Sequence, residues 1–382
     1  MVDEVELLIE DIAFGGKGVG RLEGKAVFLP FTIAGERIAA RIVREKKSFA
    51  EAELIRIIEP SPHRIAARCP YFGCCGGCAY QQMHYAHQLE WKARQVEQAL
   101  RRIGKFPDPP MRPIVPSPNE YEYRNRITVH VEDGVVGFFR YNQHRLIEVE
   151  QCPIARPEVN GALRKLRARR PHDGHYTLRA DAEPRLFSQI NDAVAAQLAE
   201  TITHLVPTDC ILVVDAYCGA GFFAKRVVAG GVDPSPNEIS HPRESRGHRL
   251  RLQRVIGLDW DIHAISAARL NATGIETYVA GDVGTHLAVE LAKADLRLTT
   301  VIADPPAVGL SAEVRAALRQ HPVATLLYVS CNPPTLARDL ADLGSAFRLE
   351  SVTPFDMFPQ TAEIEVLAHL TANCLRTTFE PE

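Results

Sequence analysis

The 382-residue sequence lacks any uninterrupted apolar run that approaches the ~18 to 20 residues needed for a membrane-spanning helix. It also lacks an excess of positive charge, since 44 Lys and Arg residues against 47 Asp and Glu residues leave a formal net charge of -3. Acidic residues occupy the N-terminal segment MVDEVELLIEDIAFGG, where a secretory signal would be basic. We therefore expect a cytoplasmic protein with no membrane partner, which meets any anionic partner through local basic surface.

Hydrophobic residues make up 46% of the sequence and charged residues 24%, which is typical of a folded protein with two or three domains. Four of the nine cysteines crowd together: Cys69, Cys74, Cys75 and Cys78. A chain of this length does not suit a secreted disulfide framework. The crowded cysteines therefore indicate a metal or cluster site, and the scattered ones have to be interpreted individually.

Residues 1 to 60 are expected to form short strands separated by glycine turns. Between positions 36 and 43, the apolar residues Ile38, Ala40 and Ile42 occupy alternate positions, which is the pattern of a half-buried strand. Five such strands would close into a small OB-like β-barrel of the kind that often binds oligonucleotides. Because barrels serve many functions, the pattern predicts a fold and only weakly a function.

Residues 61 to 180 are predicted to form a small α+β central domain. The segment 85–103 has helical periodicity, with one apolar stripe formed by Leu89, Ala93, Val96 and Leu100. A Pro-rich stretch at 106–118 ends this helix and suits a linker. In ITVHVEDGVVGFFR, a Glu-Asp-Gly turn between two apolar runs predicts a hairpin.

Residues 181 to 382 are predicted to fold as a doubly wound, Rossmann-like α/β domain. Buried apolar strands alternate with helical segments, and three of the strands end in an acid: Asp215, Asp259 and Asp304. Ligands of such sheets bind at the carboxyl edge of the strands, so this half is expected to be catalytic.

An insertion at about 231–254 interrupts the α/β pattern and is far longer than a typical connection. It is polar and rich in Pro and Arg, with arginines every two to three residues at Arg243, Arg246, Arg249, Arg251 and Arg254. The segment is either a solvated insertion or an RNA-contacting loop, since both explain a run of positive charge.

The segment DAYCGAGFF, residues 215 to 223, is a glycine turn between a buried strand and a helix. Gly219 and Gly221 would let the backbone approach a ligand closely. Asp259 is placed to accept hydrogen bonds from a ribose diol, and Asp282 in AGDV could reach an adenine amine. The set fits S-adenosylmethionine at least as well as a dinucleotide, because no third glycine or basic clamp for a pyrophosphate is evident.

In LYVSCNPPTLARD, residues 327 to 339, an apolar strand delivers Cys331 to the carboxyl edge of the sheet, where Asn332 and two prolines stop the strand. A thiolate at the edge of a ligand crevice is a plausible nucleophile. A cysteine inside a strand is usually a small buried hydrophobic residue, but this location favours a functional one.

Together with these segments, DPPAVGL (304 to 310) and FPQTAEIE (358 to 365) complete a set of ordered motifs that resembles the RNA uridine C5-methyltransferase family. The N-terminal barrel resembles the TRAM domain of that family. The resemblance spans nearly the whole chain and is closest to the subgroup with a TRAM domain and an iron–sulfur cluster, whose members mostly modify large-subunit ribosomal RNA and in some cases tRNA.

The resemblance implies that Cys331 adds to C6 of uracil, that C5 then accepts a methyl group from S-adenosylmethionine, and that Glu365 removes the C5 proton as the base. It also implies that Gln189, Tyr217 and Asp304 contact the cofactor. RNA, most often large-subunit ribosomal RNA, is the implied partner, and no obligate protein partner follows from the sequence.

Two positions depart from the family pattern. Ala307 stands where an Arg usually follows the double proline, which can change affinity or target choice. Glu363 stands where a His is usual, and its like charge can perturb the pKa of the base Glu365. Since nucleophile and base are both present, we expect an active enzyme; a cluster-bearing RNA-binding protein that has lost turnover is the non-enzymatic alternative.

Four thiolates suit either zinc or a [4Fe-4S] cluster on ligand type alone. The resemblance implies the iron–sulfur cluster, with a structural role and with these ligands: Cys69, Cys75, Cys78 and Cys152. Cys74 is expected not to be a ligand.

A rival class, the amine or amide N-methylases, places an aromatic residue beside the substrate nitrogen, where this sequence has Ala307 and Val308. Such an enzyme would not need Cys331. The basic residues expected to meet RNA lie in the barrel, at Arg124 and Arg126, and in the run RKLRARR at 164–170.

Overall fold

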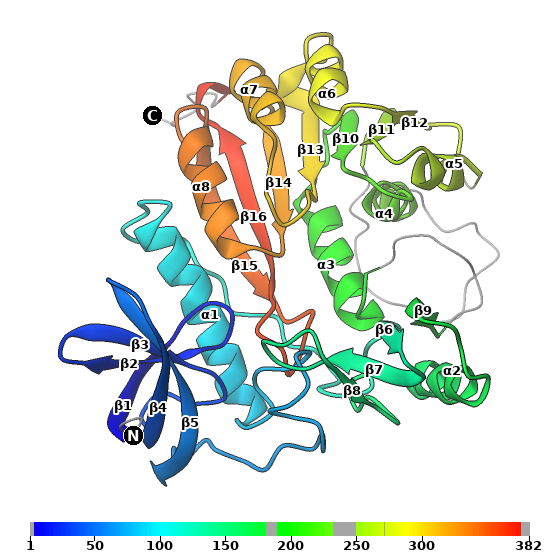
Figure 1. The fold of residues 1–382 in the computed structure, drawn as a ribbon. Helices are drawn as coiled ribbons and strands as arrows, with labels where there is room; N and C mark the ends of the chain where they lie inside the picture. The colour runs from blue at the N-terminus through cyan, green and yellow to red at the C-terminus, as the bar shows by residue number, and fades with distance from the viewer. Residues whose placement is uncertain (1–3, 181–188, 232–249, 271, 376–382) are drawn as a thin grey trace, which may run out of the picture.

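The computed structural model describes residues 4–180, 189–231, 250–270 and 272–375. Figure 1 shows a small barrel at the N-terminal end, a middle region with one long helix and a short sheet, and a C-terminal half built on a larger sheet. Within the described ranges, no helix is long and apolar enough to cross a membrane. Most of the expected insertion at 231–254, including Arg243, Arg246 and Arg249, lies outside the described residues.

The N-terminal strands close into a barrel with the order β1-β2-β3-β5-β4, as the sequence predicted. Their bounds are β1 (Glu4–Ile12), β2 (Gly18–Leu22), β3 (Lys25–Leu29), β4 (Arg37–Glu45) and β5 (Phe49–Glu59). Alternate side chains such as Leu7, Ile9 and Ile38 point inward and form the small core of the barrel. Charged side chains on the outward positions pair across neighbouring strands, for example Arg41 with Glu53.

Helix α1 (Tyr85–Arg102) has almost the predicted bounds and lies between the barrel and the large sheet (Figure 1). Its apolar residues Val96 and Leu100 join the main core. The buried face of α1 is wider than the predicted apolar stripe, because it also contains Gln88, Lys92 and Gln95.

The central region contains a four-stranded antiparallel sheet with the order β8-β7-β6-β9. Its elements are β6 (Arg126–Glu132), β7 (Val135–Phe139), β8 (Leu146–Glu148), β9 (Gly174–Arg179) and helix α2 (Pro157–Ala168). The predicted hairpin is β6 and β7, joined by Asp133 and Gly134, whose φ angles of 51° and 78° give the left-handed turn that matches strand twist. Ile127, Val129 and Leu163 share the core between this sheet and α2.

The C-terminal half is built on a seven-stranded sheet with the order β12-β11-β10-β13-β14-β16-β15. Its strands are β10 (Leu212–Ala216), β11 (Arg254–Asp259), β12 (Glu276–Ala280), β13 (Thr299–Ala303), β14 (Thr325–Ser330), β15 (Phe347–Phe355) and β16 (Glu365–Ala372). Strands β10 to β14 are parallel, whereas β16 inserts antiparallel between β14 and β15. The predicted doubly wound fold is confirmed.

Helices cover both faces of this sheet and make two hydrophobic cores. They are α3 (Asp192–Leu205), α4 (Phe222–Gly231), α5 (Ile262–Leu270), α6 (Val283–Leu291), α7 (Ala312–Gln320) and α8 (Pro333–Leu343). Side chains of α1, α6, α7 and α8 share one core with the sheet, and side chains of α3, α4 and α5 share the other. Both faces are therefore closed, which leaves the ends of the strands as the place for a ligand.

Candidate active site and cysteine-lined cavity

A cavity of about 440 Å³ lies at the carboxyl edge of the parallel strands. The predicted site residues in its wall are Gln189, Tyr217, Gly219, Asp259, Asp304, Cys331 and Glu365. Most of them end a strand or follow one directly, and parallel strands bring these ends to one edge of the sheet. The fold therefore gathers the predicted nucleophile, the predicted base and most of the predicted cofactor contacts around one space.

The glycine turn after β10 is held in an unusual backbone conformation. Tyr217, Gly219 and Gly221 all have left-handed φ angles, of 65°, 53° and 81°. The Gly219 N–H donates to Oδ2 of Asp259 at 2.8 Å, and the Asp261 N–H donates to Oδ1 at 2.8 Å. Since a carboxylate has about four acceptor sites, Asp259 keeps capacity for a ligand diol.

Two predicted cofactor residues lie outside the wall of the cavity. A Cβ added at Gly221 would lie 2.6 Å from Oη of Tyr278, so Gly221 serves the close packing behind the turn. Asp282 caps α6, because its Oδ1 accepts hydrogen bonds from the Thr285 N–H and Oγ1, each at 2.7 Å. Contact of Asp282 with an adenine stays a prediction.

Two acids near the cavity are buried enough to resist ionisation. Burial raises the pKa of Asp215 to about 8, although its Oδ2 accepts a hydrogen bond from the Ala224 N–H at 2.9 Å. Burial also raises the pKa of Asp304 to about 7, and the Gln189 side chain opposes that shift by donating to Oδ2 at 3.3 Å. These carboxyls make the cavity ready for a cationic ligand, which would favour their charged forms.

Cys331 follows β14 and is half-buried in the wall of the cavity. Burial raises the pKa of its thiol to about 12, with further contributions from the negative charges of Glu365 and Asp304. A thiol in such surroundings stays protonated until a neighbour or a substrate changes its environment. The position suits a nucleophile that becomes reactive only in the loaded site.

Glu365 is the first residue of β16 and is 4% exposed. Burial raises its pKa well above the usual carboxyl range, and Asp304 and Glu363 add to the shift. Glu363, by contrast, is exposed, and its Oε2 lies 3.6 Å from Nη2 of Arg124. A buried carboxyl with a raised pKa is suited to general-base catalysis, so the environments of the two acids favour Glu365 over Glu363.

The cavity also contains side chains that the sequence did not single out as parts of this site. Trp260 and Phe358 line it, and Arg126, expected only to contact RNA, stands in its wall. Their places in the sequence could have indicated them, because Trp260 directly follows Asp259 and Phe358 is the first residue of the FPQTAEIE segment. Ala307 is exposed, and its carbonyl accepts a hydrogen bond from Thr335 Oγ1 at 3.1 Å.

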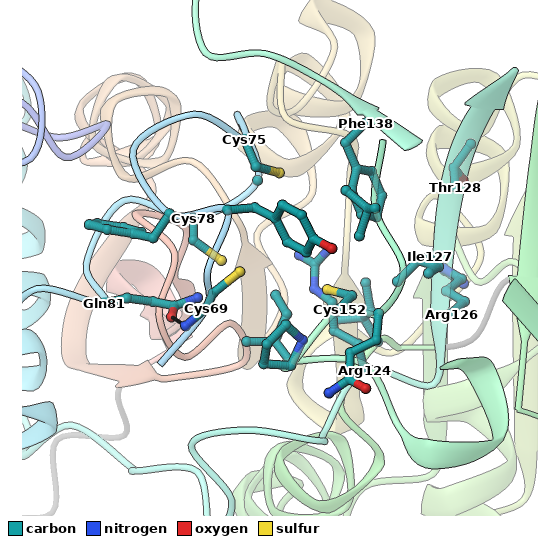
Figure 2. A pocket seen from close by; sticks show the side chains of 18 residues that line it. Cys69, Cys75, Cys78, Gln81, Arg124, Arg126, Ile127, Thr128, Phe138 and Cys152 are labelled. Carbon is teal, nitrogen blue, oxygen red and sulfur yellow. Dashed lines mark hydrogen bonds between the residues drawn. The ribbon is translucent and has the colours of Figure 1, made fainter. Parts of the chain in front are cut away.

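A second cavity, of about 290 Å³, lies between the segment after the barrel and the central sheet. Figure 2 shows Cys69, Cys75, Cys78 and Cys152 around this cavity. Cys74 is exposed and does not line it. Arg126 and Ile190 line both cavities, so a single layer of side chains separates them.

The four cysteines that line this cavity are held mainly as protonated thiols. Burial raises the pKa of Cys78 to about 12 and that of Cys152 to about 11. Within the part of the chain that the structure describes, no group of three or more His, Cys, Asp or Glu side chains is arranged to hold a metal ion. The structure brings the four predicted ligands from two segments to one cavity, and a cluster bound there stays a prediction.

Most basic residues of the barrel are paired with acids. Lys17 lies 2.9 Å from Glu51, and Arg21 lies 3.4 Å from Glu10. Nearer the two cavities, Arg124 and Arg126 have their positive charge in the walls. The predicted contacts of these basic residues with RNA stay predictions.

Comparison with known proteins agrees with this arrangement. The sequence profile of the family described as tRNA (Uracil-5-)-methyltransferase matches residues 172–373, which is more than half of the chain. The chain belongs to this family. The profile of the TRAM domain matches residues 2–55, the segment that forms the barrel up to β5.

Similar proteins share nearly the whole length. An uncharacterized RNA methyltransferase of Bdellovibrio bacteriovorus is 30% identical, over 96% of this chain and 95% of its own. Another from Gloeobacter violaceus is 29% identical, over 96% of each chain. The solved structure of the Pyrococcus abyssi tRNA (uracil-54, C5)-methyltransferase with S-adenosyl-L-homocysteine has a TM-score of 0.68 at 21% identity, over 96% of this chain and 100% of that one. This chain is thus a member of the RNA (uracil-5-)-methyltransferases, enzymes that use S-adenosylmethionine.

Proposed function

We propose that this enzyme methylates C5 of a uridine in large-subunit ribosomal RNA through a covalent adduct with Cys331. The observation that carries the proposal is the shared wall of one cavity, which contains Cys331, the buried carboxyl Glu365 and the glycine turn. The TRAM barrel and the cysteine-lined cavity support ribosomal RNA through the resemblance to the iron–sulfur subgroup. Transfer RNA, the substrate of the Pyrococcus abyssi protein, is the alternative.

The reaction follows from the residues in the wall. The Cys331 thiolate forms a bond to C6 of uracil, and the electrons of the C5–C6 double bond move to the O4 oxygen, which makes C5 nucleophilic. S-adenosylmethionine, when bound, supplies a methyl group to C5. Glu365 then removes the C5 proton, the double bond re-forms, and the thiolate leaves C6. Cys331 acts at C6 and Glu365 at the neighbouring C5. The reaction involves no net oxidation or reduction.

Residues for holding the cofactor are present in the wall. Asp259 has free acceptor capacity for a ribose diol, and the left-handed turn at Gly219 lets the backbone approach closely. Gln189 and Asp304 lie opposite, hydrogen-bonded to each other. Trp260, 74% exposed beside Asp259, offers a ring on which an adenine could stack.

For the second cavity we propose a [4Fe-4S] cluster held by Cys69, Cys75, Cys78 and Cys152. The support is the donor set of four thiols, the cavity of about 290 Å³ that they line, and the resemblance to the iron–sulfur subgroup. The cluster would join the segment after the barrel to the start of α2. Because the methylation is redox-neutral, its role would be structural.

The mechanism is tested with RNA that contains 5-fluorouridine, in which fluorine replaces the proton that the base must remove. With S-adenosylmethionine, we expect a protein–RNA adduct that survives denaturation, because the thiolate cannot leave C6. Cys331→Ala should form none, whereas Cys374→Ala, at an exposed cysteine outside both cavities, should form as much as the wild type. An adduct that persists in Cys331→Ala, or none in the wild type, would contradict the mechanism.

The target RNA is identified by mapping 5-methyluridine in ribosomal and transfer RNA from cells with and without the gene. Loss of one 5-methyluridine from large-subunit ribosomal RNA is expected. Loss from transfer RNA alone would replace the ribosomal assignment and leave the mechanism intact.

A further inference from the structure

Helix α1 contributes a charged side chain to the interior that neither the cofactor site nor the cysteine cavity uses. Lys92 and Asp356 are both 0% exposed, and Nζ of Lys92 lies 2.6 Å from Oδ1 of Asp356. The same Nζ donates to the carbonyl oxygen of Phe358 at 2.9 Å. Burying such a pair costs more desolvation energy than it usually returns, so stability alone is a weak reason for it.

The partner segment of Lys92 is the loop 356–364, which joins β15 to β16. Phe355, before the loop, pairs with Glu365 after it. Phe358 and Glu365 stand in the wall of the cavity with Cys331. Lys92 therefore holds the loop from behind, at the carbonyl of a residue whose side chain faces the reacting groups.

Other contacts from the same side hold the centre of the loop. The Gln360 N–H donates to Oε1 of Gln88 at 3.1 Å, and Nε2 of Gln88 donates to the Gln360 side chain at 3.0 Å. Tyr123 Oη donates to the Pro359 carbonyl at 2.9 Å. Gln360 has a left-handed φ of 70°, which a residue with a Cβ adopts only when its surroundings enforce it.

Few contacts orient the carboxyl group of Glu365. Its buried Oε1 has no hydrogen-bond partner among the described residues. The direction of its carboxyl is then set by the backbone at the start of β16 and by the packing of the loop before it. A loop that relaxed by even about 1 Å would misplace the base, and misplacements of that size can cost on the order of 100-fold in rate.

We propose that Lys92 is a positioning residue for proton removal: its ammonium group fixes loop 356–364 so that Glu365 faces the C5 proton of the methylated adduct. This inference rests on the proposed function. It assigns Lys92 to one step, because Glu365 directly follows the loop, whereas Cys331 is positioned by β14 and α8, outside the loop. Addition and methyl transfer should therefore proceed without Lys92, while proton removal should not.

The test compares Lys92→Met with Gln95→Met, a buried residue one turn along the same helix. Gln95 donates to the carbonyls of Ile12 and Ala13 in the barrel and does not contact the loop. Each variant is incubated with S-adenosylmethionine and RNA that contains natural uridine. For Lys92→Met we expect turnover about 10- to 100-fold below that of the wild type, little change in KM, and an accumulated denaturant-stable adduct that carries the methyl group. Gln95→Met should accumulate none.

The same variants with 5-fluorouridine RNA separate the possible outcomes. Wild type, Lys92→Met and Gln95→Met should all form the adduct at similar rates, since that substrate stops before proton removal. If Lys92→Met slows adduct formation as much as turnover, Lys92 is structural and the proposal is wrong. If the wild type forms no adduct, the proposed function itself fails.

Where Lys92→Met does not fold, the double variant Lys92→Met with Asp356→Leu replaces the whole pair by apolar side chains, a change that buried pairs often tolerate. It still lacks the hydrogen bond to Phe358, so adduct accumulation on natural uridine is again expected. Normal turnover without accumulation in this variant would overturn the proposal.

Discussion

At the scale of single residues, the site combines acids whose pKa is raised with a thiol that is kept protonated. Burial is the main cause in each case: it raises the pKa of Asp304 to about 7 and that of Cys331 to about 12. A free site in this state avoids the cost of several unpaired negative charges in one cavity. A cationic ligand would favour the ionised form of these carboxyls. The pH dependence of cofactor binding therefore tests whether their ionisation contributes to affinity.

We expect the affinity for S-adenosylmethionine to rise between pH 6 and pH 8. Asp304, with its pKa near 7, is mostly neutral at the lower pH and mostly ionised at the higher one, and only the ionised form attracts the sulfonium cation. The gain should be at most about tenfold, the ratio of the ionised fractions. Calorimetric titration measures it. S-adenosyl-L-homocysteine, which lacks the sulfonium charge, should show a smaller change, and a slope unaltered in Asp304→Asn would contradict the assignment.

The sequence alone could indicate those candidate site residues that lie at the carboxyl ends of strands. Cys331 and Asp304 lie where apolar runs stop, and the sheet topology brings them together. The roles of Gln189 and Glu365 came from the family resemblance, because neither occupies a position that spacing alone distinguishes. Asp282 follows a strand as well, but it lies outside the residues that line the cavity and its Oδ1 caps α6, so its contact with an adenine stays a prediction.

At the scale of elements, the turn between β10 and α4 depends on a residue without a side chain. Gly221 has a φ of 81° and packs against the ring of Tyr278. We expect Gly221→Ala to lower stability by about 1–3 kcal/mol and to weaken S-adenosylmethionine binding at least tenfold, because the clash displaces the turn. Chemical denaturation and calorimetric titration measure the two effects.

Gly24→Ala is the matched control for this prediction. Gly24 also has a left-handed φ, of 82°, but a Cβ there meets nothing within 4 Å. The backbone cost of about 1 kcal/mol should appear without any change in cofactor affinity. Equal effects of the two variants on cofactor binding would show that the clash with Tyr278 is not the cause.

Helix α1 shows why an element can be predicted while its function cannot. Its bounds follow from helical periodicity, and Val96 and Leu100 enter the core as expected. The apolar stripe also predicted that Leu89 and Ala93 face the core. They are only half-buried, whereas Lys92 is fully buried. The sequence alone does not indicate that Lys92 is buried, because its partner Asp356 lies far along the chain and only the fold brings the two together.

At the scale of the whole molecule, the proposed cluster joins two distant segments of the chain. Cys69, Cys75 and Cys78 precede α1, and Cys152 precedes α2. We expect anaerobically purified Cys152→Ser to lose iron and visible absorbance, and its Tm to fall, because the metal-free fold loses the stabilisation that the bound cluster supplies. Iron analysis and thermal unfolding check this result.

Cys74→Ser serves as the control for the cluster prediction. Cys74 is exposed and stands outside the cavity wall, so its loss should leave both iron content and Tm unchanged. A wild-type protein that is colourless and contains zinc without iron would refute the proposed cluster. The sequence could suggest four cysteines for a metal site, but the convergence of Cys152 with the others depends on how the central sheet folds back.

The strand order of the large sheet also bears on synthesis. Strand β16 comes after β15 in the chain but lies between β14 and β15 in the sheet. During synthesis, β15 therefore emerges before its neighbour β16, with the earlier segment 110–115 already present to hydrogen-bond to it, and Glu365 arrives only with β16. A chain that stops before β16 would therefore lack the strand that separates β14 from β15 and the carboxyl that β16 places in the wall of the cavity.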